Sequence, residues 1–206
     1  MGFVKVENIK VSVLLLTALV AIGTRLFSIV RFESVIHEFD PWFNYRATEY
    51  LIENGFRKFL NWFDDKSWYP LGRLVGVTVY PGLMLTSAAL HWILNSVLAI
   101  GVSTKDICVF LAPGFSALTS FATYLLTSEV KDSSAGLLAA IFMAVAPGYV
   151  SRSVAGSYDN EAIAIFILVT TFYFWIRAVK YGSVQDSCLA ALFYFYMSSA
   201  WVDTFL

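Results

Sequence analysis

Long apolar segments separated by short polar ones dominate the chain. The first covers residues 11–30, with Arg25 as its only charged residue. A membrane-spanning helix needs roughly 17–25 largely apolar residues, and several of the later segments are near the lower limit. The pattern predicts an all-α, polytopic transmembrane helical bundle of about five spans. Besides the first span, the predicted spans are residues 107–127, 134–150, 162–179 and 187–206.

The segment 75–100 is apolar but ambiguous, because the string YPG within it breaks a helix. If this segment does not span, the hairpin 107–150 returns the chain to the side on which it began. The loops 31–106 and 151–161 then share one face. Lys131 would lie in a tight cytoplasmic turn, in agreement with the positive-inside rule. We therefore expect one long external loop, partly helical, before the second span.

Composition agrees with a membrane protein. The chain is 58% hydrophobic and 14% charged, with a mean hydropathy of +0.68, and its apolar share exceeds that of an ordinary globular domain. A net charge of −1 argues against a nucleic-acid partner, which needs a basic surface. Lys5 and Lys10 precede the first span and no small-x-small cleavage site follows, so we expect an uncleaved span with residues 1–10 in the cytoplasm. Cys108 and Cys188 lie in apolar segments and form no redox or zinc motif.

Two acidic pairs are the candidate chemistry. Glu38 and Asp40 are two residues apart, as are Asp159 and Glu161. In extended backbone such residues point to the same side, so each pair can face one object. Carboxylate oxygens suit hard ions, and two pairs on one face predict a Mg²⁺ or Mn²⁺ site. Helix capping is the competing interpretation, with Asp40 as an N-cap before Pro41 and the second pair opening the helix that follows it.

Arg152 lies seven residues before Asp159, at the end of a predicted span. It can be an interface arginine whose charge reaches water, or it can face a phosphate-bearing or peptide substrate beside the cation. His37 is interpreted as a loop residue. A cation transporter would also use carboxylates, but it would place them at mid-membrane depth rather than at span ends.

Longer strings carry a more specific signal. Five of them resemble the catalytic subunit of eukaryotic oligosaccharyltransferase, and the resemblance extends from the first span to about Trp201. It implies a fold of the GT-C type and transfer of a preassembled oligosaccharide from dolichyl diphosphate to Asn in Asn-x-Ser/Thr sequons. It also implies the endoplasmic reticulum membrane, with the acidic motifs lumenal. The strings are RFESVIHEFDPWFNYRATEYL, NWFDDKSWYPLGR, YPGLM, APGYVSRSVAGSYDNEAIAIF and YFYMSSAW.

The resemblance also implies roles for single residues. Glu38 and Asp40 match the family's first acidic motif, in which the residue at Asp40 contacts both the metal and the acceptor Asn. Asp159 and Glu161 match the second motif, which supplies further metal ligands, and Arg152 matches an arginine that matters for activity. The implied cofactor is Mn²⁺ or Mg²⁺. The implied partners are the other subunits of the complex, the dolichyl-diphosphate-linked oligosaccharide, the acceptor polypeptide and the lipid bilayer.

The chain departs from the family after MSSAW. Residues 202–206 read VDTFL where the family has a Gly-Gly-containing turn into further spans. The later spans, the residues that grip the lipid diphosphate and the soluble lumenal domain with its WWDYG motif have no counterpart. We therefore expect residues 1–206 to be the N-terminal part of the transmembrane domain, inactive in isolation. A non-catalytic scaffold or short isoform, and another polyprenyl-phosphate-sugar glycosyltransferase, are the alternatives.

Overall fold

The computed structural model describes the backbone of residues 2–201 and the side chains of residues 7–201. The predictions on the tail 202–206 lie outside the described residues. Helices dominate, and the described part of the chain holds a single two-stranded sheet. In this sheet β1 (Phe63–Asp64) pairs antiparallel with β2 (Arg73–Leu74), with Phe63 opposite Leu74.

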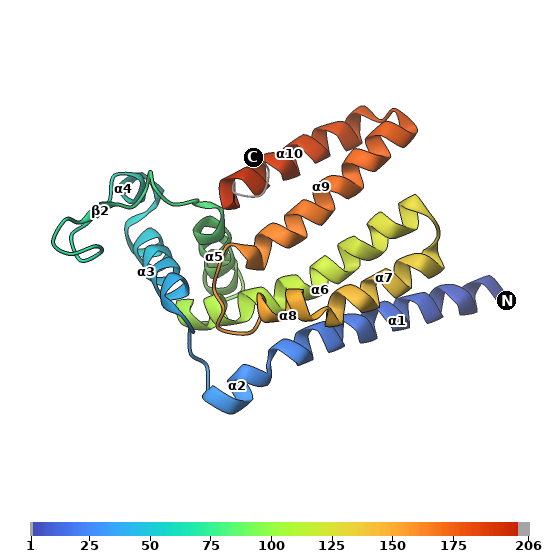
Figure 1. The fold of residues 1–206 in the computed structure, drawn as a ribbon, viewed down its shortest axis with the longest axis horizontal. Helices are drawn as coiled ribbons and strands as arrows, with labels where there is room; N and C mark the ends of the chain where they lie inside the picture. The colour runs from blue at the N-terminus through green and yellow to red at the C-terminus, as the bar shows by residue number, and fades with distance from the viewer. Residues whose placement is uncertain (1, 202–206) are drawn as a thin grey trace.

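The helices follow one another as Figure 1 shows. A π-helical turn, η1 (Ile93–Val97), continues α5. The helices are α1 Gly2–Arg25, α2 Phe27–Phe32, α3 Phe39–Asn54, α4 Phe56–Leu60, α5 Gly82–Trp92, α6 Thr104–Val130, α7 Ser133–Val145, α8 Pro147–Ser151, α9 Glu161–Tyr181 and α10 Val184–Ala200.

Three segments of the described chain are long and apolar enough to cross a membrane. They are Glu7–Phe32, Thr104–Val130 and Glu161–Tyr181. Helix α7 has 13 residues and α10 has 17, so both are shorter than these three. The ambiguous segment 75–100 contributes the 11-residue α5, which begins directly after Pro81, and the short η1. A helix of that length is too short to cross a bilayer.

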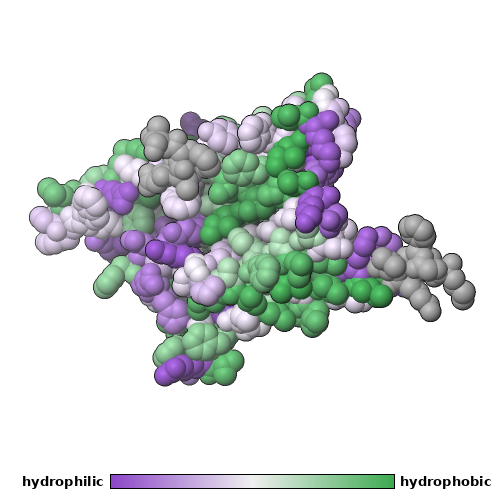
Figure 2. Space-filling model, turned by 45° about the vertical axis from the view of Figure 1, so that its right-hand side comes forward, coloured by the Kyte–Doolittle hydropathy of each residue, from purple (hydrophilic) through white to green (hydrophobic). Residues whose placement is uncertain are grey.

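The long helices pack side by side. Helix α1 contacts α6 and α7, α6 also contacts α9, and α9 contacts α10. All five extend toward one end of the molecule, whereas α3, α4 and the hairpin lie at the other end (Figure 1). Figure 2 shows a hydrophobic band over the long helices with hydrophilic residues on either side. Such a band is the surface expected of helices that contact lipid.

Local sequence explains where the long helices begin. Ser103, Asp132 and Ser183 are the N-cap residues of α6, α7 and α10, and each side chain accepts a backbone N–H from the following turn. These bonds satisfy donors that a helix terminus leaves unpaired. Gly182 ends α9 in the left-handed conformation, with φ of 61°, as glycine does at helix ends.

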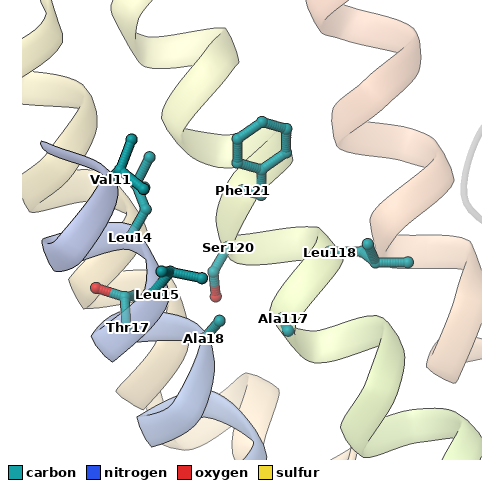
Figure 3. A pocket seen from close by; sticks show the side chains of 9 residues that line it. All are labelled: Val11, Leu14, Leu15, Thr17, Ala18, Ala117, Leu118, Ser120 and Phe121. Carbon is teal, nitrogen blue, oxygen red and sulfur yellow. The ribbon is translucent and has the colours of Figure 1, made fainter. Parts of the chain in front are cut away.

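An apolar cavity of about 330 Å³ opens between α1 and α6 (Figure 3). None of its lining residues is charged. The hydroxyls of Thr17 and Ser120 donate to carbonyls of their own helices, so neither is left to orient a ligand. This cavity is a gap between membrane helices and holds none of the candidate chemistry.

Arg25 is fully buried near the end of α1. Its Nε donates to Ser153 Oγ at 2.6 Å, and its Nη1 donates to the carbonyl oxygen of Ala144 at 2.9 Å. The ring of Tyr149 lies 4.7 Å from the guanidinium carbon. Because a buried charge is costly unless it is hydrogen-bonded, these contacts fix α1 against the segment that leads to the second acidic motif.

Candidate active site

The first acidic motif lies at the start of α3. This helix begins at Phe39, so Glu38 occupies the N-cap position and Asp40 lies in the first turn. The interpretation of Asp40 as an N-cap is therefore wrong. Glu38 does not cap through its side chain either, and it has a φ of 71°, a conformation that costs a non-glycine residue about 1–3 kcal/mol. The helix dipole favours the negative charge of Asp40 in the first turn.

The second acidic motif leads into α9. The Asp159 Oδ1 accepts the backbone N–H of Asn160 at 2.7 Å, and Glu161 is the first residue of the helix. Asn160 holds the N-cap position without a side-chain cap bond, so neither carboxylate is the N-cap of α9. The Arg152 Nη1 lies 3.8 Å from the Glu161 Oε2, and 64% of the Arg152 side chain is exposed.

The fold brings the two motifs together. Asp40 and Asp159 line one cavity of about 240 Å³, here called the acidic cavity. The carboxylates of Asp159 and Glu38 lie close enough to Glu161 to repel it, and Arg152 attracts it. Thus all five predicted site residues gather in one region. The other residues that line the acidic cavity are Phe43, Asn44, Arg73, Thr78, Val79, Tyr80, Met84 and Asn160.

A buried hydroxyl network connects the elements that carry the motifs. Tyr158 is fully buried, and its hydroxyl donates to Ser87 Oγ on α5 at 2.7 Å and lies 2.8 Å from Thr48 Oγ1 on α3. The side-chain amide of Asn44 donates to the Tyr158 carbonyl oxygen at 3.2 Å. Burial raises the pKa of the Tyr158 hydroxyl well above its ordinary value, so the hydroxyl stays protonated as a donor.

Gly156 joins the segments that lead to the two motifs. Its carbonyl oxygen accepts the N–H of His37 at 3.0 Å, and its N–H donates to the Val109 carbonyl on α6 at 3.1 Å. Its φ is 93°, and a Cβ at this position would lie 2.2 Å from the carbonyl oxygen of Val35. Only glycine allows this close approach. The loop residue His37, whose ring lies beside Gly156, is half-buried.

The donor chemistry of the acidic cavity and its edge suits a hard cation. Asp40, Asp159 and Glu161 offer carboxylate oxygens, and Mg²⁺ and Mn²⁺ prefer oxygen ligands. The Oδ1 of Asn160 is also buried there without a hydrogen-bond partner. Among the side chains that the structure describes, those of residues 7–201, no group of three or more His, Cys, Asp or Glu is arranged to hold a metal. A cation would therefore take part of its coordination from water or substrate oxygens.

Sequence reasoning missed three residues of this region: Arg73, Tyr158 and Asn160. Each lies inside one of the strings that resemble the family, but no local pattern marks it. Asn160 stands between two acidic residues, which was the clearest available signal. Tyr158 acquires its hydroxyl contacts from segments distant in the sequence. Arg73 contacts Thr78 and Trp68 nearby and Phe43 on α3, and only the fold brings it to the same cavity as Asp159.

Comparison with known families gives a consistent result. The family model described as "Oligosaccharyl transferase STT3, N-terminal" matches residues 9–206. The dolichyl-diphosphooligosaccharide–protein glycosyltransferase subunit stt-3 of Caenorhabditis elegans is 61% identical over 193 residues, which cover 94% of this chain and 25% of the relative. The subunit STT3 of Saccharomyces cerevisiae is 62% identical over 181 residues, which cover 88% of this chain and 25% of the relative. The chain spans about a quarter of the length of these relatives.

Solved structures share the fold. The archaeal oligosaccharyltransferase AglB of Archaeoglobus fulgidus, in complex with an inhibitory peptide and a dolichol-phosphate, matches with a TM-score of 0.76 at 22% identity, over 95% of this chain and 24% of that one. The Archaeoglobus fulgidus oligosaccharyltransferase in the apo form matches with a TM-score of 0.69 at 26% identity, over 93% and 22%. The structure of the same enzyme in complex with Zn and sulfate matches this chain with a TM-score of 0.73 at 22% identity. The match covers 92% of this chain and 25% of that one. The predicted helical membrane bundle of the GT-C type is confirmed, and the chain belongs to the oligosaccharyl transferase STT3 family, whose N-terminal region it matches.

Proposed function

We propose that this chain forms the acidic face of an oligosaccharyltransferase catalytic subunit. The reaction is transfer of a preassembled oligosaccharide from dolichyl diphosphate to the side-chain amide of Asn in Asn-x-Ser/Thr sequons. One observation carries the proposal: Asp40 and Asp159, far apart in the sequence, line the same cavity. The names of the relatives, which are dolichyl-diphosphooligosaccharide–protein glycosyltransferase subunits, support the reaction.

Asp40 acts on the acceptor amide. A carboxamide nitrogen is a poor nucleophile because its lone pair is delocalised into the carbonyl. The Asp40 carboxylate accepts a hydrogen bond from the acceptor N–H₂, orients the nitrogen and is the base within reach of its proton. The nitrogen then forms a bond to the anomeric carbon while the bond from that carbon to the diphosphate oxygen breaks. Attack from the opposite side inverts the configuration.

Asp40, Asp159 and Glu161 would hold Mn²⁺ or Mg²⁺. When bound, such a cation neutralises negative charge on the departing diphosphate. Arg152 is the residue of this chain that contacts the diphosphate directly, since its exposed guanidinium lies beside Glu161 and suits bidentate recognition of phosphate oxygens.

The membrane arrangement follows from the same proposal. The chain lies in the endoplasmic reticulum membrane with residues 1–10 in the cytoplasm, and α3 and the acidic cavity face the lumen. The five spans are α1, α6, α9, α10 and the pair α7 and α8, which together cover residues 133–151. Other subunits of the complex surround them. The position of Lys131 in the turn between α6 and α7 supports this orientation by the positive-inside rule.

A chimaera tests the proposal in a full-length protein. This chain replaces the matching quarter of the Saccharomyces cerevisiae subunit, and the purified complex is assayed for glycosylation of a sequon peptide. We expect Asp40→Asn and the double variant Asp159→Ala with Glu161→Ala to lose at least about 100-fold in rate, the order found when a charge-stabilising group is removed. The matched control is Asp65→Asn, which changes an exposed carboxylate in the segment 31–106 that also contains Asp40.

The metal part of the proposal has its own readout. A chelator should abolish transfer and added Mn²⁺ should restore it, and titration should show weaker Mn²⁺ binding to the double variant than to the control. Undiminished glycosylation by the double variant would refute the assignment of Asp159 and Glu161 to a metal site.

A further inference from the structure

Arg73 forms part of the wall of the acidic cavity and is held in one orientation. Its Nε donates to Thr78 Oγ1 at 2.9 Å, and its Nη2 donates to the Thr78 carbonyl oxygen at 3.1 Å. The rings of Phe43 and Trp68 lie 5.3 Å and 5.6 Å from its guanidinium carbon, within the range of cation–π attraction. The guanidinium is therefore positioned before any ligand arrives.

No carboxylate pairs with this arginine in the described part of the chain, where five ion pairs occur. By contrast, Arg46 on α3 pairs with Asp64 at 2.7 Å. A guanidinium has five N–H donors, and Thr78 accepts only two of them. The remaining donors can bind an oxygen-bearing ligand in the acidic cavity.

The size of the acidic cavity limits what that ligand can be. Its volume of about 240 Å³ is below the roughly 300–1,000 Å³ of pockets that enclose drug-sized ligands. It accommodates a side chain with its adjoining peptide unit, whereas an oligosaccharide would have to extend out of it. The acceptor Asn and its own main chain fit this limit.

The position of Arg73 also favours the acceptor over the lipid-linked donor. Its backbone lies on β2, in the hairpin at the end of the molecule opposite the N-terminus (Figure 1), and its side chain reaches the acidic cavity from that side. The donor diphosphate is tethered to the membrane and so stays near the ends of the spans, where Arg152 and Glu161 lie. A polypeptide can approach from the aqueous side, where Arg73 is.

We propose that Arg73 binds the acceptor polypeptide, donating hydrogen bonds to a main-chain carbonyl beside the acceptor Asn while that side chain enters the acidic cavity. This inference rests on the proposed function. A main-chain contact positions any sequon irrespective of its neighbouring side chains, and the planar donor group of arginine gives it direction. Arg73 is thus a binding residue that acts on acceptor affinity.

Steady-state kinetics of the purified chimaeric complex test the inference. The variants are Arg73→Met, which removes the charge, Arg73→Lys, which keeps it, and Arg57→Met, the control at an exposed cation on α4. We expect Arg73→Met to raise KM for the sequon peptide about tenfold, the effect of losing one charge-assisted hydrogen bond, with an unchanged KM for the lipid-linked donor. Arg73→Lys should be intermediate, and Arg57→Met should match the parent.

A peptide with an ester in place of the amide beside the acceptor Asn adds a second readout. The ester carbonyl is a weaker acceptor, so it should raise KM in the parent and not in Arg73→Met. An unchanged acceptor KM in Arg73→Met overturns the inference, as does a raised donor KM. If Arg73→Met does not assemble, Arg73→Lys is judged by the same criteria. Full activity of Asp40→Asn would refute the proposed function instead, whatever Arg73 does.

Discussion

Replacing Gly156 with alanine should separate the two acidic segments. Gly156 accepts the N–H of His37 and donates to the Val109 carbonyl, so it connects the chain before Asp40 to α6. It also lies three residues before Asp159 in the sequence. The methyl group of an alanine at position 156 would therefore shift both acidic motifs, although it would contact neither of them.

The structure gives the size of the effect. The new Cβ would lie 2.2 Å from the Val35 carbonyl oxygen and 2.7 Å from the His37 Cδ2, whereas real Cβ contacts are essentially never below 3.0 Å. Since backbone is the obstacle, the segment leading to Asp40 must move by about 1 Å, a displacement that can cost about 100-fold in rate. The φ of 93° adds about 1–3 kcal/mol of strain for a non-glycine residue.

Glycosylation of a sequon peptide by the purified chimaeric complex measures the rate, and thermal unfolding of the complex measures the strain. Gly148→Ala is the matched control, because Gly148 lies in α8 and its Cβ would meet no heavy atom within 4 Å. We expect Gly156→Ala to fall about 100-fold in kcat and Gly148→Ala to retain the parent rate. Equal rates in the two variants would refute the view that Gly156 sets the spacing of the motifs.

Two further predictions concern stability. Tyr158→Phe removes the hydroxyl that lies between Ser87 and Thr48, and each of these two residues keeps a hydrogen bond to its own helix. We therefore expect the free energy of unfolding of the complex, measured by chemical denaturation, to fall by about 1–2 kcal/mol. An unchanged free energy would show that the network contributes nothing. Burial alone would raise the pKa of Asp64, but Ser67, the Lys66 N–H and Arg46 lower it overall. Its folded pKa is then below the unfolded value, so its stabilisation is complete above the unfolded pKa of about 3.9 and is lost as pH falls through the folded pKa. Asp64→Asn should flatten this acid dependence of the thermal midpoint, and an unaltered profile would contradict the assignment.

Much of the fold could be predicted because its signals are local. The apolar segment 107–127 lies inside α6, and the YPG string coincides with the start of α5. Proline and glycine constrain the backbone wherever they occur, and apolar length reports directly on burial in lipid. The extension of each helix to its N-cap, such as Ser103 before α6, was harder to place because several polar residues compete for that position.

The candidate site was predictable only in part. Spacing and family resemblance predicted Asp40, Asp159 and Glu161 as site residues, and the structure brings Asp40 and Asp159 to one cavity, but the alternative interpretation of Asp40 as an N-cap was wrong. Whether a carboxylate caps a helix depends on the φ and ψ of one residue, and the positive φ of Glu38 moved the start of α3 before Asp40. No sequence pattern indicates that a glutamate will adopt such a conformation.

The sequence by itself determined the helical membrane class and the family, since these depend on composition and on contiguous strings, and it predicted which acidic residues form the candidate site. Only the tertiary structure decided that Asp40 and Asp159 share one cavity, that Gly156 connects the segments before them, and that Arg73 lines the cavity without a carboxylate partner among the described residues. The physical reason is distance along the chain. The contact of Thr48 with Tyr158 joins residues 110 positions apart, and such contacts form only when the whole bundle packs.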